Sequence, residues 1–233
     1  MALFDNMVER FEAFCDTAQG IFVNRVEEML LEELMDLSAG QQWIDLGCGT
    51  GTYSAMLASR GCRVVGVDES KSMLQRAMRK QSNAVSTVDY LLGNITQLPF
   101  ASGTFDGALL QVTLEFVSAP GRVLEEALRV LKLRGRLVLG LIQGSGDWAK
   151  SYRVRALENP SSVYKSAHFW TFPELVKLIG RFPSDLRAGL YVGPEEFSTA
   201  EEAWTLENCR RRSCFMDRAG FLALRYDRKD FRP

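Results

Sequence analysis

The stretch WIDLGCGTGTYSAMLASRG, from Trp43 to Gly61, decides the fold of this 233-residue chain. An apolar run ends in glycines at every second position, Gly47, Gly49 and Gly51, and a helical pattern follows at once. Glycines at the end of a strand let a ligand approach the backbone closely, and the N-terminus of the next helix attracts anions. The stretch therefore predicts a ligand site between a strand and a helix.

Two common kinds of glycine-rich loop do not fit this spacing. A P-loop requires GxxxxGK[ST], but Gly51 is followed by Thr52 and Tyr53, with no lysine nearby. The dinucleotide fingerprint is GxGxxG, whereas this loop reads GxGxG. Asp45, at the end of the strand, would repel a pyrophosphate but suits an ammonium group. A nucleoside that carries an amino acid would satisfy both the loop and the acid.

The chain between residues 42 and 142 alternates short apolar runs with helical patterns. The expected strands are Trp43–Leu46, Val64–Val67, Tyr90–Leu92, Ala108–Val112 and Leu137–Ile142, and the expected helices are Tyr53–Arg60, Ser72–Lys80 and Arg122–Leu131. Continuous apolar strands separated by amphipathic helices are typical of a parallel sheet covered on both faces. The fold class is therefore α/β.

The flanking segments extend this core. Residues 1–40 read as a helix, a break near Gly20 and a long amphipathic helix. Residues 144–170 lose the strand pattern and are rich in polar and aromatic side chains, which favours a lid. A helix follows, with Thr171 as its N-cap and Gly180 as its stop. Two later runs, Leu186–Val192 and Phe221–Tyr226, are expected to close the sheet.

Composition and charge narrow the classes of function. Hydrophobic residues make up 46% of the chain, charged residues 24%, and the net charge is −1, so no global field attracts nucleic acid. The N-terminus lacks the pattern of a signal peptide, and no apolar run is long enough to span a bilayer. The five cysteines show no metal spacing, so we expect free thiols in a reducing cytoplasm and no metal site. The segment CRRRSC, from Cys209 to Cys214, is interpreted as a solvated basic edge.

Further polar residues follow the other expected strands. Asp68 ends the second strand, 21 residues after Gly47, where a carboxylate can accept two hydrogen bonds from ribose hydroxyls. Asn94 and Ile95 follow the third strand and can meet an adenine edge. The fourth strand brings Gln111, Thr113 and Glu115 to the same rim.

These motifs together resemble the class I S-adenosylmethionine-dependent methyltransferases. IDLGCGTG is similar to the first motif of that family, VVGVDES to the second, GNITQLPF to the third and FDGALLQVTLEFV to the fourth. Two flanking segments resemble sequences of its type 11 group, namely FEAFCDTAQGIFVNRVEEMLLEEL and YKSAHFWTFPELVKLI. The resemblance implies one Rossmann-like domain over residues 1–233, with seven strands ordered 3-2-1-4-5-7-6 and the last antiparallel. Its parts would be an N-terminal helical cap (1–40), a cofactor core (41–143), a lid insertion (144–170) and the rest of the sheet (171–233).

The resemblance also implies cofactor contacts. Asp45 and the glycine loop would hold the methionine portion, Asp68 the ribose with Glu69 beside it, and Asn94 the adenine amino group. Thr113 would lie near the sulfonium. The complete expected set is Asp45, Gly47, Cys48, Gly49, Gly51, Tyr53, Asp68, Glu69, Asn94, Ile95, Gln111 and Thr113. Tyr53 packs either beside the methionine chain or simply between helix and sheet, and Cys48 is expected to be a small filler.

Two residues are candidates for catalysis, each with an ordinary structural alternative. His168, the only histidine, can accept a proton near neutral pH, or it is a hydrogen-bonded lid residue. Glu115 is either a base or anchor, or half of a salt bridge. Phe11, Phe14, Trp148, Tyr152 and Tyr164 are expected to form an aromatic cap over the substrate, or to pack within the lid.

The sequence therefore predicts an enzyme that moves a methyl group from S-adenosyl-L-methionine to a small-molecule acceptor and releases S-adenosyl-L-homocysteine. It lacks the [DNS]PP[YFW] and Pro-Cys motifs of nucleic-acid methyltransferases, so no nucleic-acid partner is expected, and the chain is expected to be a monomer or homodimer. One alternative is a non-catalytic protein that binds the cofactor or its product, as a sensor or assembly subunit. The other is a nicotinamide oxidoreductase, against which the glycine spacing argues.

Overall fold

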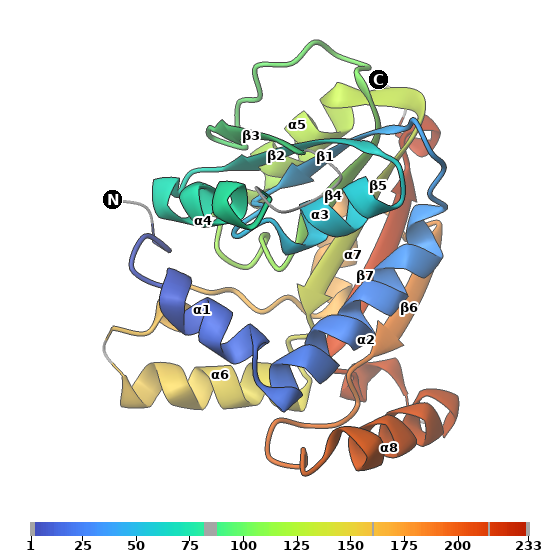
Figure 1. The fold of residues 1–233 in the computed structure, drawn as a ribbon. Coiled ribbons are helices and arrows are strands. Elements are labelled where there is room, and N and C mark those ends of the chain that lie inside the picture. The colour runs from blue at the N-terminus through green and yellow to red at the C-terminus, as the bar shows by residue number, and fades with distance from the viewer. Residues whose placement is uncertain (1–2, 82–87, 160, 214, 232–233) are drawn as a thin grey trace.

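A seven-stranded sheet forms the centre of the computed structural model, which describes residues 3–81, 88–159, 161–213 and 215–231 (Figure 1). The strands are β1 (Gln42–Leu46), β2 (Arg63–Asp68), β3 (Val88–Leu92), β4 (Phe105–Gln111), β5 (Leu131–Ile142), β6 (Asp185–Gly189) and β7 (Phe221–Asp227). Their order is β3-β2-β1-β4-β5-β7-β6. β7 runs antiparallel to β5 and β6, and the other neighbouring strands are parallel. The expected order and the antiparallel last strand are confirmed.

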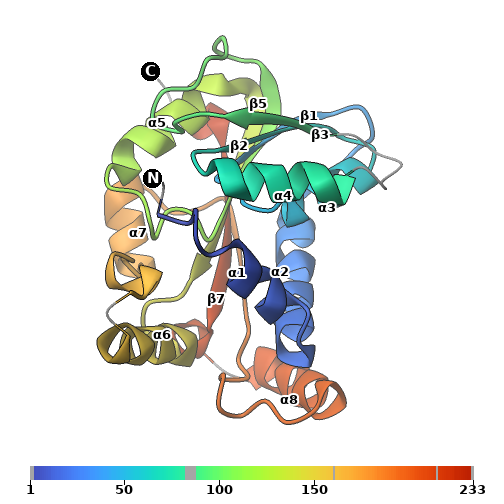
Figure 2. The same cartoon turned by 60° about the vertical axis from the view of Figure 1, so that its left-hand side comes forward.

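Helices cover both faces of this sheet (Figure 2). One face carries α2 (Ala18–Met35), α3 (Thr52–Ser59) and α4 (Lys71–Gln81), and the other carries α5 (Pro120–Val130) and α7 (Phe172–Ile179). On the first face Leu30 and Leu57 belong to the same buried cluster as Trp43. On the second face Leu124 and Leu175 are buried in one cluster with Ile44. Burial on both sides explains why the strands read as continuous apolar runs.

The remaining helices lie beyond the carboxyl ends of the parallel strands. They are α1 (Val8–Cys15), α6 (Asp147–Glu158) and α8 (Ala200–Ser213), with short 3-10 helices at Val163–Lys165 and Met216–Arg218. A third 3-10 helix, Arg228–Asp230, follows the antiparallel strand β7 and lies at the opposite end of the sheet. The expected lid region therefore contains a helix, α6, and a 3-10 turn. Because ligands of open α/β sheets bind at the carboxyl ends of the strands, α1 and α6 flank the expected site.

The break between the two N-terminal helices differs from the expected one. α1 ends at Cys15 and α2 begins at Ala18, with the Thr17 hydroxyl accepting a hydrogen bond from the Gly20 amide as its N-cap. Gly20 lies inside α2, and a Cβ there would fall 1.9 Å from the Phe14 carbonyl oxygen. This glycine therefore permits close contact between the end of α1 and α2 instead of breaking the chain.

Two further expectations at the C-terminal side need correction. The strand expected at Leu186–Val192 ends earlier, at Gly189, because Leu190 adopts a positive φ of 60°. Two of the three arginines of α8, Arg210 and Arg211, are half-buried, whereas Arg212 is exposed as expected. Arg210 donates to Glu196, and Arg211 lies 3.6 Å from Glu33 of α2, while Cys214 lies outside the described residues. No helix in the described ranges is long and apolar enough to cross a membrane.

Candidate functional site

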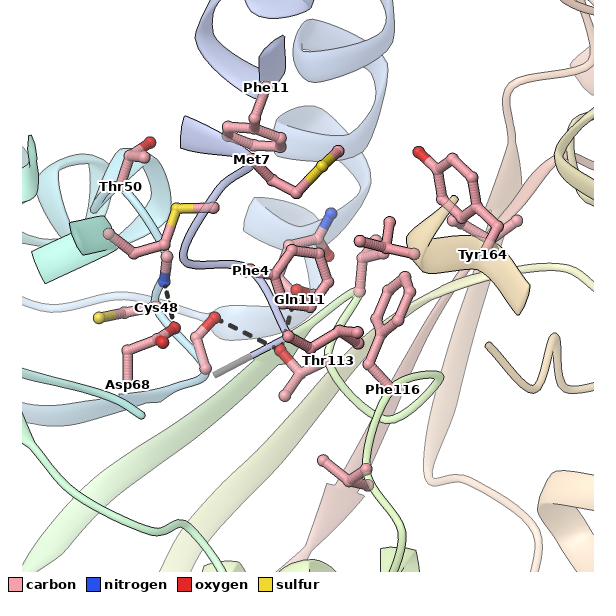
Figure 3. A pocket seen from close by; sticks show the side chains of 18 of the residues that line it. Phe4, Met7, Phe11, Cys48, Thr50, Asp68, Gln111, Thr113, Phe116 and Tyr164 are labelled. Carbon is pink, nitrogen blue, oxygen red and sulfur yellow. Dashed lines mark hydrogen bonds between the residues drawn. The ribbon is translucent and has the colours of Figure 1, made fainter. Parts of the chain in front are cut away.

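A cavity of about 820 Å³ opens at the carboxyl ends of β1, β2 and β4. It is bounded by the glycine loop after β1, the connections after β2, β3 and β4, the N-terminal segment with α1, and α6 with the turn after it. All of the expected cofactor residues except Gly51 line it. Figure 3 shows Asp68 and Cys48 on one side, Phe116 and Tyr164 on the other, and Gln111 and Thr113 between them.

The glycine loop owes its shape to backbone conformations that disfavour side chains. Gly47, Gly49 and Gly51 all have positive φ angles, of 74°, 53° and 78°. A Cβ on Gly47 would lie 2.4 Å from the Thr113 methyl group, and one on Gly51 would lie 2.1 Å from the Tyr90 hydroxyl. A Cβ on Gly49 would meet nothing within 4 Å. The outer two glycines therefore hold the loop against the sheet, and the middle one leaves open space.

Asp45 is buried beneath this loop. Its Oδ2 accepts a hydrogen bond of 2.6 Å from the Ser54 hydroxyl at the start of α3. Burial, with a further contribution from the negative charge of Asp68, raises the pKa of Asp45 to about 7. A cationic group in the cavity would favour the ionised form of this carboxyl.

Asp68 ends β2 and joins that strand to the glycine loop. Its two carboxylate oxygens accept hydrogen bonds of 2.8 Å from the Gly49 and Ser70 amides, and burial nevertheless raises its pKa. Glu69 beside it is exposed, and Asn94 is exposed on the connection after β3. The Asn94 Oδ1 already accepts from the amide and hydroxyl of Thr96, so the expected adenine acceptor also stabilises its own turn.

The end of β4 carries a strained residue that the sequence did not reveal. Val112 has a φ of 48°, which is rare for a β-branched side chain and costs about 1–3 kcal/mol. It lies between Gln111 and Thr113, and all three line the cavity. Leu190, another non-glycine residue with positive φ, lines the cavity as well. Such strain is concentrated at ligand sites, where it turns neighbouring side chains toward a ligand.

The N-terminal segment is tied across the cavity by polar contacts that the sequence did not reveal either. Glu12 of α1 accepts a hydrogen bond from the Thr50 hydroxyl, and it forms ion pairs of 2.9 Å with Arg76 and 3.1 Å with Lys80 of α4. Asp5 accepts from the Ser70 hydroxyl beside Asp68. Phe4, Met7 and Phe11 project from this segment toward the cavity (Figure 3).

Aromatic side chains form a wall of the cavity, with Phe116 and Tyr164 across from Asp68 (Figure 3). All five residues of the expected aromatic cap line the cavity, namely Phe11, Phe14, Trp148, Tyr152 and Tyr164. Tyr152 and Tyr164 stack with their ring centroids 4.2 Å apart. Phe116 lies 6.3 Å from Tyr164 and packs edge-on against Phe4 at 4.9 Å. The sequence analysis missed Phe4 and Phe116, which come from the chain terminus and from the connection after β4.

The two residues considered for catalysis do not line the cavity. The His168 side chain is 56% exposed, lies 3.7 Å from Glu174 and packs edge-on against Trp170, as a surface lid residue would. Glu115 is buried and accepts a hydrogen bond from the Ile142 amide. Burial raises the pKa of Glu115 to about 8. The Glu115 carboxyl is thus bound through Oε1 to the backbone of β5, and its Oε2 is buried without a partner among the described residues.

A different acid, Glu27 of α2, does line the cavity. Its Oε2 accepts hydrogen bonds from the Tyr53 hydroxyl at 2.8 Å and from the Gln111 side-chain amide at 2.7 Å. Burial raises the pKa of Glu27 to about 7. The sequence did contain a signal, because Glu27 lies on the apolar face of α2 between Val23 and Leu30, where an acid is out of place.

The side chains that line the cavity favour an organic cation over a metal ion as the ligand. Within the described ranges, no group of three histidine, cysteine or acidic side chains is arranged to hold a metal. Burial, with the charges of Asp45 and Asp68, raises the pKa of the Cys48 thiol well above its usual range, so this thiol stays neutral. The open space at Gly49 and the carboxylates of Asp45 and Asp68 fit S-adenosylmethionine, whose ammonium and ribose hydroxyls are hydrogen-bond donors.

Known sequences similar to this chain include methyltransferases. A family model described as "Methyltransferase domain", of type 11, matches residues 44–139. A demethylmenaquinone methyltransferase from Paenarthrobacter aurescens is 34% identical over 137 residues, which are 59% of this chain and 52% of that protein. The enzyme of the same name from Clavibacter sepedonicus is 40% identical over 101 residues, 43% of this chain and 41% of that protein. The chain thus spans about half the length of the curated relatives that it matches first.

Solved structures share the whole fold. A crystal structure from Thermotoga maritima, described as a SAM-dependent methyltransferase and possible histamine N-methyltransferase, has a TM-score of 0.74 at 23% identity. That match covers 97% of this chain and 98% of the other. Geranyl diphosphate C-methyltransferase from Streptomyces coelicolor, solved with S-adenosyl-L-homocysteine, has a TM-score of 0.62 at 18% identity. That match covers 88% of this chain and 76% of the Streptomyces chain. At these identities the likeness shows the fold.

Proposed function

We propose that the chain, whose residues 44–139 match a type 11 methyltransferase-domain model, is a class I S-adenosylmethionine-dependent methyltransferase. It would transfer a methyl group from S-adenosyl-L-methionine to a small-molecule acceptor. S-adenosyl-L-homocysteine is the second product. One observation carries the proposal: Asp45 and Asp68 flank a glycine loop with positive φ angles, and both acids line one large cavity together with Gly47 and Gly49.

The same residues would hold the cofactor. Asp68, with Glu69 beside it, would bind the ribose hydroxyls, and Asp45 and the Gly47–Gly51 loop would hold the methionine end. Asn94 and Ile95 would meet the adenine, since both line the cavity after β3. Cys48 fills space within the loop, where it is buried and neutral. Thr113, whose hydroxyl donates to the Gln111 carbonyl at 3.1 Å and lies 3.5 Å from the Gly47 carbonyl, would lie near the reacting group.

The bound cofactor supplies a methyl group already activated by a sulfonium, so the protein mainly orients the acceptor for in-line displacement and excludes water. Orientation of this kind contributes on the order of 7–11 kcal/mol in favourable cases. The N-terminal cap, held by Glu12 and Asp5, and the aromatic wall would enclose the reactants. We propose accordingly that residues 1–233 act as one domain, with 1–40 as a cap and 144–170 as a lid.

The acceptor is proposed to be a small molecule with an apolar or aromatic body. Phe116, Tyr152 and Tyr164 present ring faces or edges at the cavity, and such rings are typical of small-molecule sites. Similar proteins are named for different small compounds, demethylmenaquinone and geranyl diphosphate among them. The near-neutral charge favours a small compound over a nucleic acid.

The test is incubation of the protein with methyl-labelled S-adenosylmethionine and a panel of aromatic and apolar amines, alcohols and phenols, followed by mass spectrometry. We expect a labelled product together with S-adenosyl-L-homocysteine. Tight cofactor binding without turnover across the panel would favour the sensor or assembly subunit instead. Binding of NADH but not of S-adenosylmethionine would favour an oxidoreductase.

A further inference from the structure

Glu27 is an acid in an unusual setting. It is 7% exposed and lies within the otherwise apolar buried face of α2. The described residues form no salt bridge to it, and both of its donors, Tyr53 and Gln111, are neutral. Burying a carboxylate without a positive partner is costly. A cation that enters the cavity would remove that cost.

The hydrogen bonds also leave one oxygen available. Both donors bind Oε2, and the Gln111 amide further donates to the Tyr53 hydroxyl at 3.2 Å. Oε1 accepts nothing from the described residues, yet it is not among their fully buried polar atoms without a partner. Since Glu27 lines the cavity, Oε1 is the oxygen that a ligand can reach. Three elements, α2, α3 and β4, thus fix this carboxylate with one oxygen free.

The charge of Glu27 acts on the aromatic side of the cavity. The pKa of Tyr152 on α6 is raised mainly by burial and next by the neighbouring Tyr164, and the charge of Glu27 raises it further. Asp45, in contrast, is affected by Asp68 and not by Glu27. Glu27 lines the same cavity as Tyr152 and Tyr164, and its hydrogen bonds come from Tyr53 and Gln111. Asp45 and Asp68 are instead bound to Ser54 and to the Gly49 amide, at the glycine loop. An ammonium group beside Glu27 would also be attracted to nearby aromatic ring faces.

On the basis of the proposed function, we propose that the acceptor is an amine that binds in its protonated form, with Oε1 of Glu27 as its anchor and proton acceptor. One N–H proton passes to Oε1, which leaves a neutral nitrogen with a free electron pair. That pair forms the new N–CH₃ bond while the C–S bond breaks and its electrons stay on sulfur. The methylated nitrogen carries the positive charge away, and Glu27 then releases its proton to water.

The test compares matched probes on the full chain saturated with S-adenosyl-L-homocysteine. Tryptamine and phenethylamine are titrated against tryptophol and 2-phenylethanol, in which a hydroxyl replaces the amine. For the wild type we expect the amines to bind at least tenfold more tightly than the alcohols. In Glu27→Gln this preference should fall below about threefold, because the amide keeps the shape but loses the charge.

Two controls make the result specific. Glu28→Gln removes a charge from the next residue of α2, which pairs with Arg25 at the surface, and should keep the amine preference. Glu27→Gln should have the melting temperature of the wild type. Its affinity for S-adenosyl-L-homocysteine should stay within about threefold of the wild-type value. Rescue of the preference in Glu27→Asp would support a role for the charge itself.

Three outcomes would overturn the inference. In the first, amines bind the wild type no more tightly than the alcohols. In the second, Glu27→Gln retains the preference. In the third, Glu27→Gln lowers the affinity for S-adenosyl-L-homocysteine tenfold and leaves the amine preference intact. Glu27 would then contribute to cofactor binding and not to acceptor binding. If the wild type binds no S-adenosyl-L-homocysteine at all, the proposed function itself fails and this inference falls with it.

Discussion

The backbone amide of Gly49 donates a hydrogen bond of 2.8 Å to the Asp68 carboxylate. This bond joins the loop after β1 to the tip of β2, so one acid both shapes the loop and faces the cavity. A ligand that hydrogen-bonds to Asp68 therefore also contacts a loop already held in place. Such preorganisation lowers the entropy lost on binding.

Replacement of Asp68 by alanine should weaken the binding of S-adenosyl-L-homocysteine by about 10- to 100-fold, because hydrogen bonds to a charged group contribute about 1.5–3 kcal/mol. Isothermal titration calorimetry measures the change. Asp89→Ala, at an exposed position of β3 outside the cavity lining, is the matched control and should bind like the wild type. Equal affinities for all three proteins would contradict a role for Asp68 in the site.

Replacement of Gly51 by alanine should destabilise the fold more than the same change at Gly40. Both glycines have positive φ, 78° and 84°, and that conformation costs an alanine about 1–2 kcal/mol. Only at Gly51 would the new methyl group also collide with the Tyr90 hydroxyl, which should add about 1–3 kcal/mol. Urea unfolding gives both values. Equal losses at the two positions would show that the collision is relieved without cost.

The double variant Gly51→Ala/Tyr90→Phe tests the same contact from the other side. Removal of the hydroxyl should recover part of the stability lost in Gly51→Ala. Recovery should be incomplete, because the Tyr90 ring carbon and the Ala77 methyl group would each still lie 3.0 Å from the new Cβ. The free energies of unfolding of the four proteins form a double-mutant cycle.

Loss of the charge on Glu12 should loosen the N-terminal cap. Glu12→Gln keeps a side-chain acceptor for the Thr50 hydroxyl but removes the ion pairs with Arg76 and Lys80. We expect faster amide hydrogen exchange across α1 and about three- to tenfold faster dissociation of S-adenosyl-L-homocysteine. Glu9→Gln, exposed on the same helix, should change neither rate. An unaltered dissociation rate in Glu12→Gln would mean that the cap does not control release.

Glu115 should make stability depend on pH. Burial raises its pKa in the folded state from an ordinary value of 4.5 to about 8. Between these values the folded protein holds a proton that the unfolded chain has lost, so stability decreases as pH rises, by at most about 1.4 kcal/mol per pH unit. Glu115→Gln lacks this proton. Its stability relative to the wild type should therefore increase between pH 5 and pH 8, measured by urea unfolding, and a pH-independent difference would contradict the buried, protonated state.

The sequence predicted the sheet because its inner strands, such as β1, β4 and β7, are buried on both faces and read as apolar runs. The glycine loop and Asp68 were predictable for a related reason, since local spacing places them at adjacent strand ends. The predicted break at Gly20 was wrong. A glycine in a helical pattern usually indicates a break, but here Gly20 lies within a helix and leaves space for the Phe14 carbonyl. That contact depends on how two helices pack, which local sequence does not encode.

The remainder of the site depends on contacts between distant segments. Glu27 meets Gln111, 84 positions away, and Glu12 meets Arg76, 64 positions away, so no local pattern announced either pair. The positive φ of Val112 is equally hidden, because valine disfavours it. His168 stood out as the only histidine, but rarity in a sequence does not place a side chain in a cavity.

The most direct test of the central claim is a calorimetric titration of the folded wild-type protein with S-adenosyl-L-homocysteine. We predict saturable binding of one molecule per chain, at micromolar or tighter affinity, and protection of residues 45–51 and of α1 from hydrogen exchange. A folded protein that shows neither heat nor protection at millimolar ligand would contradict the assignment of this cavity to the cofactor.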